Sequence, residues 1–160
     1  MADRRFYSGG VLGGVDAKGR LALPAPFRQV VETRSDARSL FVRVHPTLPC
    51  LLAHDATYVA KLSEDYERVD TRLFDEADGA PAPSTTARDV FGSLEEVGFD
   101  STGRFGLAPF LKARAGIERD VFYHGANTSF EIWAPDRALD GGALSSSAAE
   151  RLRFDLEARA

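Results

Sequence analysis

The pentads DAKGR (residues 16–20) and DSTGR (residues 100–104) share the pattern Asp-x-x-Gly-Arg, and each leads directly into an apolar segment. The match continues without a gap, because LALPAPFR (residues 21–28) aligns with FGLAPFLK (residues 105–112). Two such copies with matching flanks indicate an internal repeat. We therefore expect two halves that fold alike, each with a strand, a tight turn, a second strand and a short helix.

Each pentad has the residue chemistry of a tight turn. The side chains of Asp16 and Asp100 stand where they can accept hydrogen bonds from backbone N–H groups two residues on. Gly19 and Gly103 supply a left-handed backbone conformation at low cost. We assign these four residues a structural, turn-forming role, and an arginine emerges directly after each glycine.

Each copy is predicted to continue with a short helix and a closing strand. Pro24 and Pro109 suit the first turn of a helix, where the N–H that proline lacks has no intrahelical partner in any case. The segments PCLLA (residues 49–53) and SFEIW (residues 129–133) have the composition of closing strands. Residues 57–69 carry apolar side chains at helical spacing, which predicts an amphipathic connecting helix.

The second half is expected to begin after a loop. Residues 79–86 alternate proline with small residues, which is typical of a surface loop. Ser84 or Thr85 can then cap a short helix that runs through residues 90–91. Residues 94–99 are predicted to form the strand that enters the second turn.

A helix is also predicted near the C-terminus. Ser147 and Glu150 stand at the spacing of a capping box, and Leu152 and Leu156 lie on one face of the helix that follows. Because this apolar stripe is narrow, we consider two placements. The helix docks on a neighbouring subunit, or it frays as chain termini often do.

These segments resemble the MraZ family. The resemblance is carried by VDAKGRLALPAPFR (residues 15–28), by residues 100–117 and by FEIW (residues 130–133), and it covers roughly residues 7–137. It implies a bacterial transcription regulator with two SpoVT-AbrB modules, encoded at the head of the division and cell-wall gene cluster whose promoter it binds. The expected segments are repeat 1 (10–57), connecting helices and loop (58–93), repeat 2 (94–137) and a helical tail (138–160).

The resemblance also implies a fold class and an assembly. The fold is expected to be mainly β with short helices (α+β), in which the two half-repeats form one swapped-hairpin AbrB-like barrel with an additional C-terminal helix. Subunits are expected to close into a homo-oligomeric ring. Basic residues at the paired turns would then contact short direct repeats in double-stranded DNA.

The family's motif arginines fall on Arg20 and Arg104, and Lys18 lies in the first turn. With Arg28 they are the candidate DNA-binding residues. Because the second turn has Ser101-Thr102 in place of a lysine, we expect the first turn to be the stronger DNA contact. His54-Asp55 and Ala138 depart from the family's usual residues, and these departures bear on helix packing.

Composition and charge set further limits. The chain has 160 residues, of which 44% are hydrophobic, so one domain built of two halves is expected. No apolar run reaches the length of a bilayer span, which favours a soluble, cytoplasmic and nucleoid-associated protein without a membrane partner. The single Cys50 is expected to be a buried apolar residue.

The net charge of −4 opposes DNA binding if it is spread evenly, but the charges are segregated. Residues 4–28 carry five basic residues and one acidic residue, whereas residues 55–78 carry eight acidic residues and three basic ones. We therefore expect a dipolar subunit with a basic face at the turns and an acidic connecting helix.

Other function classes have less support. The three histidines lack the spacing of a zinc site and are expected at the surface or at strand ends, and no catalytic motif, metal site or cofactor site is recognisable. An alternative role for either arginine is to bridge the turn aspartate and only stiffen the barrel. Two functional alternatives stay open: a ring-forming protein-interaction module without DNA binding, and an AbrB-like antitoxin, which would normally supply one motif per chain.

Overall fold

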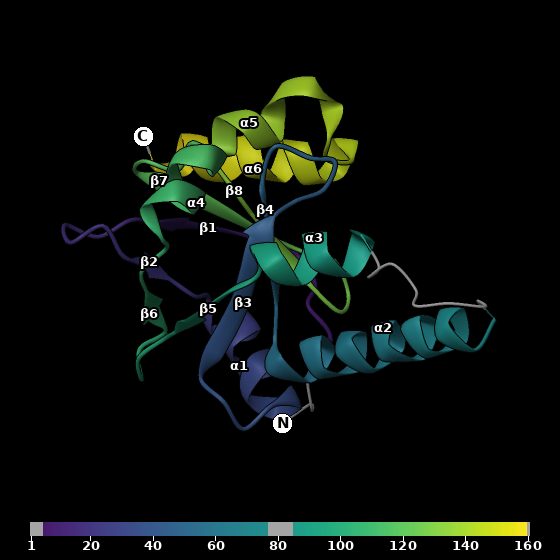
Figure 1. Ribbon diagram of the computed structural model, residues 1–160. Helices are drawn as coiled ribbons and strands as arrows, with labels where there is room; N and C mark the ends of the chain where they lie inside the picture. The colour runs from purple at the N-terminus through teal and green to yellow at the C-terminus, as the bar shows by residue number, and fades with distance from the viewer. Residues whose placement is uncertain (1–4, 77–84, 160) are drawn as a thin grey trace.

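The computed structural model of the chain describes residues 5–76 and 85–159. It is a mixed α+β structure in which every sheet pairing is antiparallel (Figure 1). The strands are β1 (Gly10–Gly14), β2 (Leu21–Ala22), β3 (Ser39–Val44), β4 (Leu51–His54), β5 (Glu95–Gly98), β6 (Arg104–Phe105), β7 (Asp120–Gly125) and β8 (Phe130–Trp133). The helices are α1 (Ala25–Arg34), α2 (Ala56–Glu76), α3 (Thr85–Ser93), α4 (Pro109–Ala115), α5 (Pro135–Leu139), the short 3-10 turn η1 (Asp140–Gly142) and α6 (Ser146–Arg159).

The two halves have the same local structure. Helix α1 begins at Ala25 and α4 begins at Pro109, so their starts are separated by the same interval as the two pentads. Phe27 and Leu111, at equivalent positions of these helices, are both buried. The predicted order of strand, turn, strand and short helix is therefore present twice.

The halves exchange strands. The larger sheet has the order β1-β7-β8-β4-β3-β5, and β2 pairs with β6 in a second, two-stranded sheet. Strand β1 of the first half pairs with β7 of the second, and β5 of the second half pairs with β3 of the first. Since the closing strands β4 and β8 pair at the centre, neither half completes the sheet alone.

An apolar core lies between the sheets and helices α1 and α4. Along β8 the side chains alternate, so that Phe130 and Ile132 join this core. The Phe130 ring packs against Phe27 at a centroid distance of 5.1 Å and against Tyr7 at 5.0 Å. Aromatic rings from three separate segments thus fill the centre of the molecule.

A second apolar cluster lies on the other side of the sheet. Cys50, Phe122 and Trp133 meet Leu144 and Leu152 there. Cys50 is 2% exposed, which confirms the predicted buried position. Burial raises the pKa of its thiol, so the residue behaves as a small apolar side chain.

Asp55 joins three segments at the start of α2. Its fully buried carboxylate accepts hydrogen bonds from Tyr7 Oη and Arg34 Nε, both at 2.7 Å, and from the backbone N–H of Tyr58 at 2.8 Å. The neighbouring His54 stacks on Tyr58 at 4.5 Å. The Asp55 carboxylate therefore connects α1 and the N-terminal segment to α2 through hydrogen bonds.

The helices differ from the sequence predictions in extent. Helix α2 runs to Glu76, beyond the predicted end at residue 69, and helices hold more of the described residues than strands do. The description as mainly β with short helices is therefore wrong, although the α+β class is correct. Residues 79–84 of the predicted loop, with Ser84, lie outside the described residues, whereas Thr85 and Thr86 already belong to α3.

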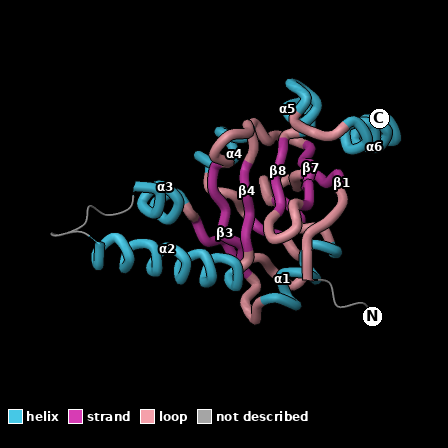
Figure 2. The backbone as a smooth tube through the Cα atoms, turned by 90° about the vertical axis from the view of Figure 1, so that its right-hand side faces the viewer, coloured by secondary structure: helices cyan, strands magenta, loops and turns pink. Residues whose placement is uncertain are grey.

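The C-terminal helix begins earlier than predicted and packs on its own chain. The backbone N–H of Ala148 donates to Ser145 Oγ at 3.2 Å, so Ser145 caps α6 instead of Ser147. Leu152 is fully buried, and Arg159 Nη1 donates to the Gly13 carbonyl oxygen at 2.9 Å. Figure 2 shows α5 and α6 beside β7 and β1, with α2 and α3 at the opposite side beside β3. The prediction that this helix frays was wrong, because the apolar stripe finds its partners on α5 and the sheet of its own chain.

We expect Leu152→Ala to lower the free energy of unfolding by about 2–5 kcal/mol, because it leaves a cavity in a packed cluster. Phe154→Ala on the same helix is the matched control, since Phe154 is 67% exposed and its loss should change stability by less than about 0.5 kcal/mol. Urea denaturation measures both. Equal effects of the two substitutions would contradict the packing of α6 on this chain.

Candidate nucleic-acid interface

The first turn is closed by Asp16 and Gly19. Asp16 Oδ1 accepts hydrogen bonds from the backbone N–H groups of Lys18 and Arg20, both at 2.9 Å. Gly19 has a φ of +80° and donates its N–H to the Asp16 carbonyl oxygen at 2.9 Å. The side chain of Lys18 is left exposed at the tip of the turn.

The second turn has the same construction. Asp100 Oδ1 accepts hydrogen bonds from the backbone N–H groups of Thr102 at 2.9 Å and Arg104 at 3.0 Å. Gly103 has a φ of +85°, and a Cβ at this position would lie only 2.9 Å from the carbonyl oxygen of Leu23. Glycine is therefore required at Gly103 both by its backbone conformation and by the close approach of the first half.

The two motif arginines meet at one carboxylate. Arg20 Nε lies 3.1 Å from Asp16 Oδ2, and Arg104 Nη1 lies 3.4 Å from the same oxygen. Their side chains remain 36% and 48% exposed. The sequence allowed for an arginine bridging its own turn aspartate; in the structure both arginines bridge to Asp16, and the Arg104 contact crosses between the halves.

A basic residue on each short helix reaches the turn of the other half. Lys112 of α4 donates from Nζ to the Gly19 carbonyl oxygen at 3.3 Å. Arg28 of α1 lies against Gly103, where an added Cβ would meet its Nη1 at 3.1 Å. Sequence reasoning had not assigned Lys112 to the site, although the alignment of LALPAPFR with FGLAPFLK places it opposite Arg28.

Pairing of β2 with β6 brings the turns to one side of the molecule (Figure 1). At this side of the molecule, cations outnumber the two carboxylates that close the turns. The cations are Lys18, Arg20, Arg28, Arg104 and Lys112. The net charge of the chain is −4, so this basic group is a local feature. Such a patch favours a polyanion at the turns even though the whole protein is acidic.

Hydrogen bonds keep both turn aspartates ionised. The pKa of Asp16 is lowered, chiefly by the backbone N–H of Arg20. The pKa of Asp100 is lowered from 3.8 to about 2, first by the hydroxyl of Thr102 and then by the backbone N–H of Arg104. Because the charged carboxylate accepts these bonds better than the neutral acid, both turns keep their closure at neutral pH.

The histidines lie outside this interface. Glu131 Oε1 accepts a hydrogen bond from Trp133 Nε1 and lies within hydrogen-bonding distance of His124 Nδ1, both at 3.0 Å, and His45 Nε2 is 3.7 Å from Oε2. Burial opposes ionisation of Glu131, but the contacts with His124 and Trp133 outweigh it and lower its pKa. His54 is 2% exposed and burial lowers its pKa to about 4, so it is a neutral core residue. His54 is the last residue of β4, which agrees with the predicted strand-end position, although it is buried because the stacked Tyr58 of α2 covers its ring.

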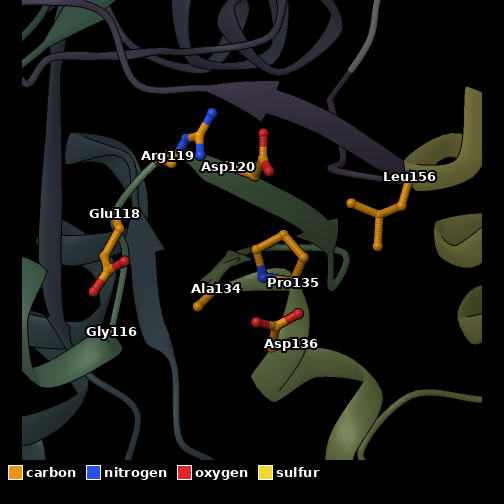
Figure 3. A pocket seen from close by; sticks show the side chains of 8 residues that line it. All are labelled: Gly116, Glu118, Arg119, Asp120, Ala134, Pro135, Asp136 and Leu156. Carbon is orange, nitrogen blue, oxygen red and sulfur yellow. The ribbon is translucent and has the colours of Figure 1, made fainter. Parts of the chain in front are cut away.

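A shallow cavity of about 190 Å³ lies between the start of β7, α5 and α6 (Figure 3). Glu118, Asp120 and Asp136 line it together with Arg119, and its wall includes no histidine, cysteine or serine. Arg159 pairs with Asp120 at 2.8 Å.

Within residues 5–76 and 85–159, no three or more His, Cys, Asp or Glu side chains are grouped so that they could hold a metal ion. In the same part of the chain, no helix combines the length and the apolar character needed to cross a bilayer.

Comparison with known proteins points to one class of relative. The transcriptional regulator MraZ of Syntrophobacter fumaroxidans is 30% identical over 128 residues, which cover 80% of this chain and 79% of that protein. The transcriptional regulator MraZ of Coxiella burnetii is 31% identical over 119 residues, 74% of this chain and 73% of that protein. That of Citrobacter koseri is 28% identical over 129 residues, with coverages of 80% and 79%. No family model matches the chain.

Asp100→Asn should destabilise the protein more at neutral pH than in acid. Since the pKa of Asp100 falls from 3.8 to about 2 on folding, its charged form contributes stability above pH 3.8, and this contribution is lost as the pH falls through about 2. The difference in free energy of unfolding between wild type and variant should therefore shrink over that range. An NMR titration of the Asp100 carboxyl carbon checks the cause, because Thr102→Val should raise its pKa; a wild-type value near 3.8 would contradict this account.

Proposed function

The chain belongs to the MraZ family of transcriptional regulators, and from this premise we propose that it represses the division and cell-wall gene cluster, including its own promoter. It would do so by binding short direct repeats in double-stranded DNA. As a transcriptional regulator it is not an enzyme. The proposal places it in the cytoplasm, associated with the nucleoid.

The observation that carries the proposal is the gathering of cations at the two turns. Arg20 and Arg104 converge on Asp16 Oδ2, at 3.1 Å and 3.4 Å, so that one carboxylate holds both guanidinium groups. Arginine pairs with the O6 and N7 acceptors of guanine through two parallel bonds, whereas lysine contacts phosphate as a point charge. We assign base reading to Arg20 and Arg104, and backbone contact to Lys18 and Arg28.

Asp16 has a second role in this proposal. Free guanidinium groups at the protein surface sample many rotamers, and their ordering on DNA costs conformational entropy. The Asp16 carboxylate, which the turn backbone itself orients, holds both side chains before DNA arrives. The interface is therefore partly preorganised by a residue that does not contact DNA.

We propose further that the two sheets form a swapped-hairpin barrel of the AbrB type with an internal pseudo-twofold axis. The exchange of β1 and β5 between the halves and the pairing of β2 with β6 support this assignment. Residues 10–57 and 94–137 would be the two SpoVT-AbrB repeats. An antitoxin of this class would normally build its barrel from two chains, so two motifs in one chain disfavour that alternative.

A homo-oligomeric ring is part of the proposal because one patch is small. A single subunit offers few cations, and its overall charge of −4 opposes DNA. Several identical patches held in one assembly raise the effective concentration of each patch at its DNA repeat. A ring-forming interaction module without DNA binding is the competing hypothesis, and the acidic side chains of α2, among them Glu64 and Asp65, motivate it.

Arg20→Ala should weaken binding to a promoter fragment by tenfold or more, since an arginine–guanine pair contributes roughly 1–3 kcal/mol. Arg151→Ala is the matched control, because Arg151 lies on α6 and its side chain is 72% exposed. Fluorescence anisotropy at fixed salt measures both, with thermal denaturation to verify folding. A folded Arg20→Ala protein that binds as tightly as wild type would refute the role of Arg20.

The salt dependence of wild-type binding separates the two hypotheses. Binding through several phosphate contacts predicts that log affinity falls linearly with log salt, by roughly 0.9 per contact. With Lys18 and Arg28 as phosphate contacts, we expect a slope of about −2 or steeper for each subunit bound to DNA. A flat dependence in anisotropy titrations from low to physiological salt would exclude the DNA-binding mechanism and favour the interaction module.

A further inference from the structure

We propose that Lys112, although it belongs to the second repeat, is a DNA-phosphate contact of the first turn. The inference rests on the proposed DNA-binding function and extends it to a residue outside both pentads. It follows from the reach of α4 across the interface between the halves, where Lys112 Nζ donates to the Gly19 carbonyl oxygen at 3.3 Å.

The chemistry of the amine suits a phosphate. An ammonium group has three N–H donors, and the bond to Gly19 uses one of them. The residue is half-buried, so its amine is held at the turn without being sealed from solvent. Two donors and a full positive charge are therefore available beside Lys18 and Arg20.

The charge of Lys112 is not neutralised within the chain. In the described residues no carboxylate forms an ion pair with it, and the Gly19 carbonyl is its polar partner. Arg20 and Arg104, by contrast, share the carboxylate of Asp16 at 3.1 Å and 3.4 Å. The arginines at the turns are thus held by a counter-charge, whereas Lys112 carries an unpaired charge suited to the DNA backbone.

The same geometry gives the two turns different sets of cations. The first turn has three cations beside it, namely Lys18, Arg20 and Lys112. The second turn has two, namely Arg104 and Arg28. The equivalent helix residues are exchanged, since Arg28 lies against Gly103 of the other half. Both repeats therefore contribute residues to the first turn. Its contact with the DNA phosphate backbone depends on Lys112, which the second repeat supplies.

Lys112→Gln tests the assignment, because glutamine removes the charge but can still donate to the Gly19 carbonyl. We expect weaker binding to both the promoter fragment and scrambled DNA, by similar factors, and a slope of log affinity against log salt that is shallower by about one unit. Lys112→Arg keeps the charge and should keep the wild-type slope. Lys61→Gln on α2 is the matched control, since Lys61 is exposed on the acidic connecting helix, and it should leave the slope unchanged.

The outcomes separate this inference from the proposed function. If wild type binds promoter DNA with a steep salt dependence and Lys112→Gln binds with the same slope, the phosphate contact is refuted while the function stands. A loss of affinity at an unchanged slope refutes it as well, because that pattern marks a residue that only positions the turn. If wild type itself shows a flat salt dependence, the DNA-binding function fails and the inference fails with it.

Discussion

Hydrogen bonding between the two halves is the constraint on which the rest of the structure depends. A strand exposes N–H and C=O groups on both edges, and these must be paired where they are buried. Strand β1 of the first half meets this requirement by pairing with β7 of the second half. Strand β5 of the second half does so by pairing with β3 of the first half. The same exchange pairs β2 with β6 and so brings both Asp-x-x-Gly-Arg turns to one side of the molecule.

The positive charge of the candidate interface is a consequence of that strand exchange. Asp16 is placed where it meets Arg104 of the other half, Lys112 reaches Gly19, and Arg28 reaches Gly103. Each of these contacts joins two residues that are far apart in the chain. A basic surface therefore forms on a protein whose net charge is −4, because topology gathers cations that the sequence separates.

The elements near the pentads were predictable because their causes are local. An aspartate that accepts backbone N–H bonds and a glycine at positive φ define a turn within a few residues. The start of each short helix follows from proline, and the closing strands from apolar composition. The placement of α6 was not predictable, because Leu152 is buried by Phe122 and Trp133, which have no sequence relation to it. The burial of His54 at the end of β4 was not predictable for the same reason, since Tyr58 of the following helix covers its ring.

The amino-acid sequence by itself determined that the chain contains two copies of one turn, that each copy carries an arginine after its glycine, and that the chain resembles one family of regulators. These properties depend on residue identity and short-range geometry. Only the tertiary structure decided which charges share the interface. The contacts of Lys112 with Gly19 and of Arg104 with Asp16 require strand pairing between halves, and such pairing is set by the whole sheet.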